Sequence, residues 1–320
     1  MKITKYEAPF NAEKMLNRLA EIFGEDERAL EAPQLLGKET ENNLDVVLLA
    51  EDESGALLGA IHATIPKREP KIAALSAMFT VKEARGTGLG RILFEKIVEE
   101  IDALGVKTSF LGTSNIVAEK LYASCGYRYL YGTGVMIRTK EGGPCDFLRE
   151  RYGKTPEKIT AAELTPSMRI PIIPLISSRL DFLVYDANTG LANPSFLTEP
   201  SCMGLYPKYS SLKERGGDAF FALDERGVLG AIASALKTES GEYSFDFFSV
   251  PTFMNAAPLL LERIERFARE NGKANLIAKV AKGDAFKEEL IKSLGFSKDG
   301  ETEIMLGGVY MKAETYRKSC

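Results

Sequence analysis

The sequence is poor in the residues that build metal sites and disulfide frameworks. It has one histidine, His62, and four cysteines, at positions 125, 145, 202 and 320, without a CxxC pair or any metal-ligand spacing. A zinc site made of His and Cys is therefore not expected, and we expect no metal cofactor. Scattered cysteines of this kind are typical of a reducing compartment, so the sequence predicts a cytoplasmic protein.

Long apolar runs and an excess of positive charge are also missing. No stretch of about 18 apolar residues occurs, and residues 1–14 lack the apolar core of a signal peptide, so we expect no membrane association. The net charge of -4 and the pI of about 5.5 argue against a general nucleic-acid binder. Cationic small molecules or basic peptide ends suit such a surface better.

What is present indicates a globular protein of two domains. The 320 residues are 45% hydrophobic and 27% charged, and they exceed the length of one ordinary core. In the first part, hydrophobic periodicity and turn residues predict an α/β pattern with a mixed sheet. The expected strands are residues 2–8, 44–51, 56–65, 72–81, 107–113 and 128–138, and the expected helices are 11–23, 89–104 and 115–124.

This order of elements returns later in the chain. The hairpin sequence DESGALLGAI at residues 52–61 reappears as DERGVLGAI at residues 224–232, followed by a strand, a helix, a strand and a short helix. Matching order and spacing predict a duplication, with a first domain at residues 1–147 and a second at 148–320. The stretch 161–215, rich in proline and aromatic residues, has no assignable elements.

The motif with the most chemical content lies between a strand and a helix. It comprises Arg85, Gly86, Thr87, Gly88, Leu89, Gly90 and Arg91. A helix start offers unpaired N–H groups and the positive end of the helix dipole, and glycines let the backbone approach an anion closely. These features predict a cradle for a pyrophosphate, with the arginines adding charge. The alternative is a glycine-rich turn that only changes the direction of the chain.

Two motifs together carry a resemblance to a known family. The loop, and the later pattern Asn115, Ala118, Leu121, Tyr122, Gly126 and Tyr127, are similar to the two signatures of the GNAT superfamily, the acetyl-CoA-dependent N-acetyltransferases. The match is good over about residues 45–138. The resemblance implies two tandem GNAT-like domains, each a mixed, mostly antiparallel sheet flanked by helices, with a degenerate second copy.

The resemblance also implies roles for individual residues. Main-chain groups of Phe79, Thr80 and Val81, on a bulged strand, would bind the pantetheine arm of acetyl-CoA. Tyr122 stands where the family keeps the acid that protonates the departing sulfur. Its alternative is an aromatic residue that simply packs in the core. Asn115 would touch the cofactor or only cap its helix.

A general base is less evident. The strand at residues 72–81 holds no acidic residue, where family members often have a glutamate. His62 is the substitute, since its ordinary pKa near 6.5 suits proton removal near neutrality. The alternatives are a hydrogen-bonded strand histidine, and a water chain leading to bulk solvent or to Glu51, Asp52 and Glu53.

The second copy lacks the chemical groups of the first. Residues 251–259, which follow Val250, contain no glycine and no arginine, and Pro251 and Pro258 offer no N–H to an anion. Aligning Gly295 with Gly126 puts Ile291 opposite Tyr122 and Asp284 opposite Asn115. We therefore expect one active site per chain, with the second half structural or forming a wall of the acceptor pocket.

The sequence thus predicts an N-acetyltransferase acting on a small-molecule or peptide amine of unknown identity. The alternatives are a regulator that binds acetyl-CoA without catalysis and a purely structural protein. A homodimer is left open as a further partner.

Overall fold

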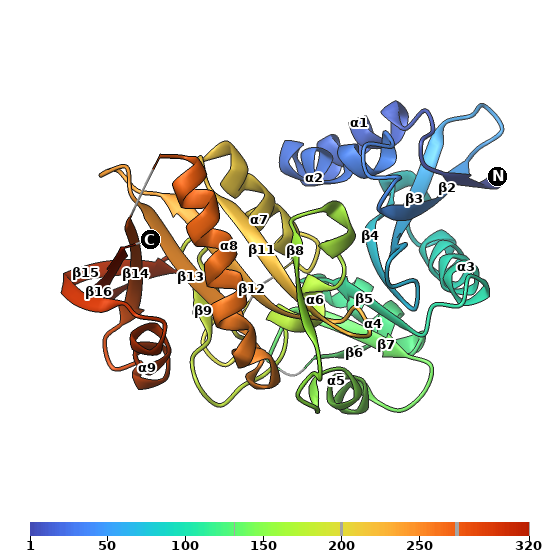
Figure 1. Ribbon diagram of the computed structural model, residues 1–320. Coiled ribbons are helices and arrows are strands. Elements are labelled where there is room, and N and C mark those ends of the chain that lie inside the picture. Colours follow the sequence, from blue (N-terminus) through green and yellow to red (C-terminus); the bar gives the residue numbers. More distant parts are fainter. Residues whose placement is uncertain (131, 199–200, 273–274, 320) are drawn as a thin grey trace.

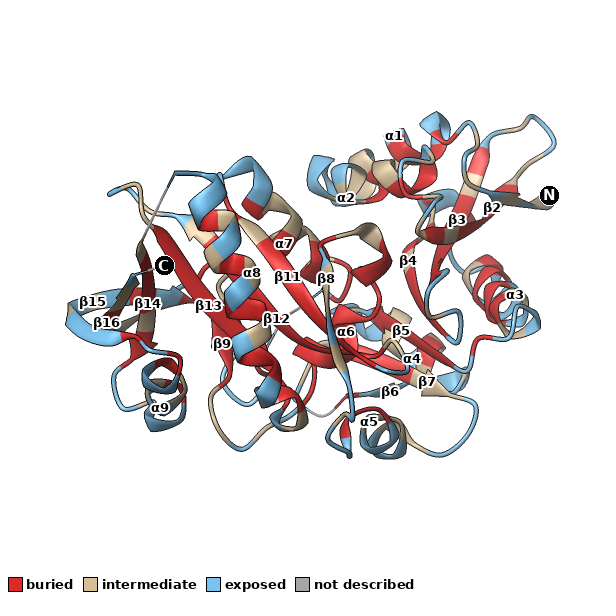
Figure 2. Ribbon diagram, in the orientation of Figure 1, coloured by how far each residue is buried: buried red, intermediate tan, exposed pale blue. Residues whose placement is uncertain are grey.

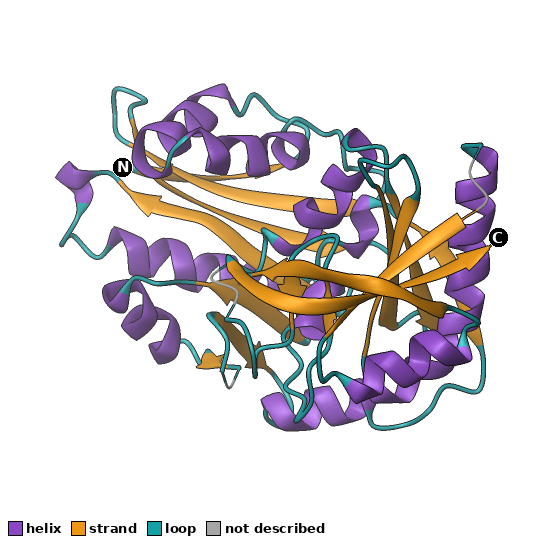
Figure 3. Ribbon diagram, turned by 90° about the vertical axis from the view of Figure 1, so that its left-hand side faces the viewer, coloured by secondary structure: helices purple, strands orange, loops and turns teal. Residues whose placement is uncertain are grey.

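The computed structural model describes residues 1–130, 132–198, 201–272 and 275–319. Within these residues the chain forms two large sheets that lie next to one another, each flanked by helices (Figure 1). Each sheet has seven strands and is mostly antiparallel, which confirms the predicted fold class. Figure 3 shows the helices distributed around the sheets.

The first sheet has the strand order β1-β2-β3-β4-β5-β7-β6. All neighbouring strands are antiparallel except β4 and β5, which are parallel. The elements of this half are β1 (Lys2–Glu7), α1 (Glu13–Phe23), α2 (Glu25–Leu35), β2 (Asn43–Glu51), β3 (Leu57–Pro66), β4 (Ile72–Thr80), η1 (Lys82–Ala84), α3 (Leu89–Ala103), β5 (Thr108–Gly112), α4 (Ile116–Ser124), β6 (Arg128–Tyr129), β7 (Val135–Thr139) and α5 (Pro144–Tyr152).

The second sheet has the strand order β8-β11-β12-β13-β14-β16-β15. Its one parallel pair is β13 with β14. The elements of this half are β8 (Ile159–Glu163), η2 (Pro166–Met168), α6 (Ile172–Ile176), β9 (Tyr185–Asp186), β10 (Leu191–Ala192), α7 (Leu205–Glu214), β11 (Asp218–Asp224), β12 (Leu229–Lys237), β13 (Tyr243–Ser249), η3 (Pro251–Ala256), α8 (Ala257–Glu270), β14 (Asn275–Ala281), α9 (Ala285–Ser293), β15 (Ser297–Leu306) and β16 (Val309–Ser319).

The two sheets share one topology, strand for strand. The parallel pair stands at the same place in both orders, and the hairpins β2–β3 and β11–β12 carry a register shift at equivalent positions. The repetition expected from the sequence is therefore present in the fold. The boundary at 147 stays a prediction; that residue lies inside α5.

Local sequence explains the elements next to the site. Leu93, Ile97 and Ile101 recur at helical spacing on α3, and all three are buried against the first sheet. Gly105 follows the helix with a φ of 87°, the left-handed conformation that glycine adopts readily at this position. In the second sheet, β12 and β13 are buried along most of their length (Figure 2), which reflects helices or loops on both faces.

Some elements differ from the sequence expectation. Helix α2 was not predicted, because its apolar residues follow no clear helical periodicity and Pro33 lies inside it. The single strand expected at 128–138 is two short strands, β6 and β7, separated by a turn that contains Gly132 with a φ of 79°. The unassigned stretch 161–215 supplies η2, α6, α7 and the small β9–β10 hairpin.

The two halves are joined through buried contacts. Side chains of both sheets contribute to one hydrophobic core, for example Phe110 and Ile137 of the first sheet with Phe221 of the second. Next to it, the buried guanidinium of Arg169 donates to the buried carboxylate of Glu39, with 3.0 Å between Nε and Oε2. The two halves are therefore packed firmly together, through a shared core and a buried ion pair.

No helix formed by the described residues has the length and apolar character needed to cross a bilayer.

Candidate active site

A cleft opens where β4 and β5 diverge. The two parallel strands pair only at residues 72–74 with 108–110, and beyond this point they separate. A cavity of about 350 Å³ lies between them. Its walls include residues 75–78 of β4, residues 111–113 at the end of β5, and Asn115, Ala118 and Tyr122 near the start and middle of α4.

The wall formed by β4 is bulged, as the resemblance implies. Opposite β3, Ser76 pairs with His62 and Phe79 pairs with Ala60, so two residues of β4 face a single residue of β3. Ala77, inside this bulge, has a φ of 50°, which is uncommon for a residue other than glycine. The bulge carries Ala77 and Met78 into the cleft wall.

The three strand residues expected to hold the cofactor are not equivalent. The N–H of Val81 donates to the carbonyl of Leu58 at 2.9 Å, so it is used inside the sheet. Backbone groups of alternate residues point the same way in an antiparallel strand, so those of Phe79 also face β3. Thr80 faces the open side, where its carbonyl accepts from Nε of Arg85 at 3.3 Å.

The glycine-rich loop presents free amides to solvent. Gly86 and Gly88 have φ values of 79° and 86°, and neither has a neighbouring atom within 4 Å of where a side chain would start. Among the described residues, no acceptor takes a hydrogen bond from the amides of Gly86, Thr87 or Gly88. Leu89, Gly90 and Arg91 form the first turn of α3, whose amides have no partner inside the helix.

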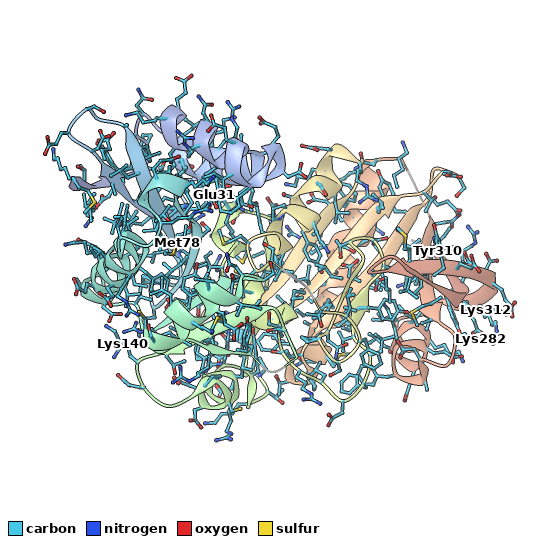
Figure 4. The ribbon with its side chains drawn as sticks, turned by 180° about the vertical axis from the view of Figure 1, so that it is seen from behind. Glu31, Met78, Lys140, Lys282, Tyr310 and Lys312 are labelled. Atoms are coloured by element: carbon cyan, nitrogen blue, oxygen red, sulfur yellow. The ribbon has the colours of Figure 1, made fainter. Side chains whose placement is uncertain are left out.

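The glycine-rich loop lies next to the cleft, because Met78 lines the cleft and also lies beside Gly90 of the loop. A side chain placed on Gly90 would meet Met78 Cε at 3.6 Å and Thr80 Cγ2 at 3.7 Å. Met78 is labelled in Figure 4 together with Glu31; both lie in the first half, far from Tyr310 at the other end of the molecule. Arg85 and Arg91 are exposed beside the loop, and Arg91 reaches Ser124 of α4 at 3.4 Å.

Tyr122 points from α4 into the same cleft. Its hydroxyl donates to the sulfur of Met78 at 3.3 Å, and its ring lies 4.6 Å from that of Phe94. The residue is 8% exposed. Burial raises the pKa of the Tyr122 phenol to about 12, so it holds its proton at neutral pH.

Asn115 caps α4. Its side-chain oxygen accepts from the amides of Val117 at 2.9 Å and Ala118 at 3.3 Å. Because Asn115 also lines the cavity, the cap holds the helix that carries Tyr122 in place at the edge of the cleft.

His62 has surroundings that do not suit a base. It is fully buried between two carboxylates, with Nδ1 at 2.6 Å from Glu31 and Nε2 at 3.0 Å from Asp45. Burial lowers the pKa of His62, but the charges and hydrogen bonds of Glu31 and Asp45 outweigh it and raise the pKa to about 10. The imidazole is therefore protonated at neutral pH and accepts no further proton, so we do not retain it as the general base.

The far wall of the cleft comes from residues that the sequence analysis did not single out. Phe23 of α1 and Glu27 of α2 contribute to it, together with residues 201–203 of the second half. No motif marks these positions, because α2 was not predicted and residues 201–203 belong to the unassigned stretch. The second half thus takes part in the cavity of the first.

Comparison with known proteins supports this arrangement. Residues 12–127 match the family model described as the acetyltransferase (GNAT) family. Residues 12–127 are a GNAT acetyltransferase domain. This acyltransferase domain contains both signature motifs and the whole β4–β5 cleft, except for the wall supplied by the second half.

Solved structures resemble part of the chain at low identity. A phosphinothricin acetyltransferase from Sinorhizobium meliloti, solved with acetyl-CoA, is 18% identical with a TM-score of 0.39, over 50% of this chain and 88% of that one. A spermidine N-acetyltransferase mutant from Vibrio cholerae is 15% identical with a TM-score of 0.39, over 50% and 93%. An N-acetyltransferase from Staphylococcus aureus is 14% identical with a TM-score of 0.36, over 51% and 97%. No curated protein sequence matches the chain significantly.

The second copy has the same splay between strands, but it is filled. β13 and β14 pair only at residues 243–245 with 276–278. Past this point the hydroxyl of Tyr185, on the β9–β10 hairpin, accepts from the N–H of Ala281 at 2.7 Å and donates to the carbonyl of Lys279 at 3.3 Å. The remaining cavity is about 20 Å³, room for little more than one water molecule.

Charged side chains complete this filling. Lys287 of α9 forms a buried ion pair with Asp246 of β13 and donates to the carbonyl of Tyr185 at 3.1 Å. Ile291, opposite Tyr122 in the repeat, is fully buried, and Asp284 caps α9 as Asn115 caps α4. Among the described residues, no group of three or more His, Cys, Asp or Glu side chains is arranged to hold a metal ion.

Proposed function

We propose that the GNAT domain transfers an acetyl group from acetyl-CoA to a primary amine, once per chain. The observation that supports this most directly is the convergence at Met78. There the bulge of β4 and the protonated phenol of Tyr122 border one cleft, and the turn with free amides lies beside it. The residues fit the cofactor, because the amides of Gly86, Thr87, Gly88, Gly90 and Arg91 and the two arginines offer the donors and charge that a pyrophosphate requires.

Each part of the site has a task in the reaction. The loop amides and Arg85 would hold the phosphates, and the open-side backbone of β4 would bind the pantetheine arm. A main-chain N–H at the bulge would stabilise the negative charge that develops on the thioester oxygen during attack by the amine. Tyr122 would give its proton to the sulfur as the carbon–sulfur bond breaks.

The test is release of free thiol from acetyl-CoA when the full chain is offered a panel of primary amines. The Gly88→Glu variant places a side chain and a negative charge among the loop amides, so we expect acetyl-CoA affinity to fall by about 100-fold or more. Gly227→Glu is the matched control. Gly227 has a φ of 81° and open space around it, as Gly88 does, but it lies in a turn of the second half.

Two results would contradict the proposal. If acetyl-CoA affinity is the same in Gly88→Glu and Gly227→Glu, the loop does not hold the cofactor. If the chain binds acetyl-CoA but releases no thiol with any amine, the alternative of a non-catalytic acetyl-CoA-binding regulator is correct. The acceptor, a homodimer and the cytoplasmic location stay predictions.

A further inference from the structure

Glu27 is the only charged side chain among the described residues that line the cleft. It lies on α2, in the part of the cleft wall that also contains Phe23, and it is partly buried. No described residue forms an ion pair or a hydrogen bond with its carboxylate, whereas its helical neighbour Glu25 pairs with Arg28 at 3.5 Å. A half-buried carboxylate without a partner, facing a cavity, is suited to a cationic ligand.

The groups around Glu27 support a role in proton transfer. Burial raises the pKa of Glu27, and the charge of Glu31, one helical turn away, raises it further. Glu31 and Asp45 hold the protonated His62 between them, so this buried trio carries one positive and two negative charges. The excess negative charge behind the cleft wall strengthens the attraction for a cation and makes Glu27 easier to protonate.

The other titratable groups in the cleft are neutral at pH 7. Burial raises the pKa of the Cys202 thiol to about 12, and nearby Glu27 and Glu31 add to this effect. Cys202 belongs to the second half and lines the same cleft as Glu27. Tyr122 is also protonated. Among the described residues that line the cleft, Glu27 is therefore the acidic side chain that an incoming amine meets.

The acidic cluster considered from the sequence is engaged elsewhere. Glu51 pairs with Lys14 at 2.9 Å, and the carboxylate of Asp52 accepts from the amides of Ser54 at 2.8 Å and Ala56 at 2.9 Å. None of these residues lines the cleft. Glu27 is thus the carboxylate that geometry offers to an amine next to the bulge.

We propose that Glu27 binds the acceptor as an ammonium ion and removes the proton that the amine must lose, so that the acceptors are cationic primary amines; this rests on the proposed function. One ammonium proton moves to Glu27 and then to solvent, and the freed nitrogen lone pair forms the carbon–nitrogen bond. The carbon–sulfur bond breaks, and sulfur takes the proton of Tyr122. The second proton leaving nitrogen restores the phenol, so one proton is released per turnover.

The experiment compares two acceptors of similar size in the wild-type chain and in Glu27→Gln. Benzylamine is an ammonium ion at pH 7, whereas aniline is neutral. We expect Glu27→Gln to lower kcat/KM for benzylamine by about 100-fold and for aniline by less than about 10-fold. The deficit with benzylamine should shrink as the pH rises toward the pKa of the free amine, because solvent then supplies the neutral form.

Controls separate a catalytic effect from a structural one. Glu25→Gln removes a carboxylate from the same helix whose side chain is 76% exposed, and should leave kcat/KM unchanged. Acetyl-CoA affinity, measured by calorimetry, should be the same in all three proteins. Equal kcat/KM and equal pH profiles for wild type and Glu27→Gln would overturn the assignment of Glu27 alone. Absence of thiol release with every amine would instead overturn the proposed function.

Discussion

The two halves of this chain have the same sheet topology, but the cleft between the diverging strands is open in the first half and filled in the second. In the first, β4 and β5 diverge around an open cavity of about 350 Å³. In the second, β13 and β14 diverge in the same way, but Tyr185 and the Lys287–Asp246 pair occupy the space. The fold alone therefore does not make a site. The site depends on whether the splay is left open and whether a loop with free amides stands beside it.

The part of the second half that runs from β9 to residue 203 contributes to both clefts. Its early part, β9, lies in the second cleft, and its later part, residues 201–203, forms a wall of the first cleft. This segment has no counterpart between β1 and β2. The second copy thus has no open cleft of its own among the described residues, and it supplies part of the wall of the first cleft.

The largest expected effect is a loss of unfolding free energy when Lys287, which helps to fill the second cleft, is replaced. Lys287→Met removes the cation from a buried cluster that also contains Asp246 and Asp186, and Asp186 already has a pKa raised to about 7 by burial and by Asp246. Leaving a buried charge without its partner costs about 3–5 kcal/mol of unfolding free energy. Urea unfolding measures this loss, while acetyl-CoA affinity should be unchanged.

Lys282→Met, at a lysine that is labelled in Figure 4, is the control. The Lys282 side chain is 61% exposed, so its replacement should change stability little. If Lys287→Met were as stable as this control, the second cleft would not be held closed by the ion pair.

The second prediction concerns the histidine under the first cleft. His62→Gln should cost about 3 kcal/mol at pH 6, at the lower end of the range for a broken buried pair, since Thr64 still hydrogen-bonds Asp45. The folded-state pKa of about 10 lies above the ordinary 6.5. The stabilisation by His62 is therefore complete below pH 6.5 and is lost as the pH rises toward 10.

Unfolding free energies of wild type and His62→Gln should accordingly converge between pH 6.5 and 10. A difference that stays constant over this range would show that His62 is not held in its charged form.

The third prediction separates catalysis from binding in the open cleft. Tyr122→Phe removes the proton donor but keeps the ring that packs on Phe94, so kcat should fall by about 100-fold, or about 2.7 kcal/mol. The affinity for acetyl-CoA should change by less than about twofold. Steady-state kinetics and calorimetry give the two values.

Tyr129→Phe, at an exposed position just after α4, is the matched control and should behave as wild type. Equal kcat values in Tyr122→Phe and in this control would remove Tyr122 from the reaction.

Sequence alone predicts the parts of the site that are local. The loop at 85–91 and Tyr122 belong to short motifs whose spacing determines a turn, a helix start and a helix face, and the structure brings them together at Met78. The repeated order of elements and the family resemblance also predict two mixed, mostly antiparallel sheets flanked by helices, although not the order of their strands. These features depend on neighbours in the sequence.

The remaining parts depend on contacts between distant residues. The environment of His62 is set by Glu31 and Asp45, which lie 31 and 17 positions away, and its own strand gives no sign of them. Glu27 was not considered because α2 has weak helical periodicity. The second cleft is filled by a hairpin in the stretch 161–215, where the sequence predicted no elements. From the sequence alone, the second copy could be seen to lack only the glycine-rich loop and a tyrosine equivalent to Tyr122.

The cleft of the first half is open to a ligand, and the cleft of the second half is closed. Isothermal titration of the wild-type chain with acetyl-CoA tests this directly. We expect one site per chain, which disappears in Gly88→Glu and remains in Lys287→Met. Two equivalent sites per chain, or a single site that survives Gly88→Glu, would contradict it.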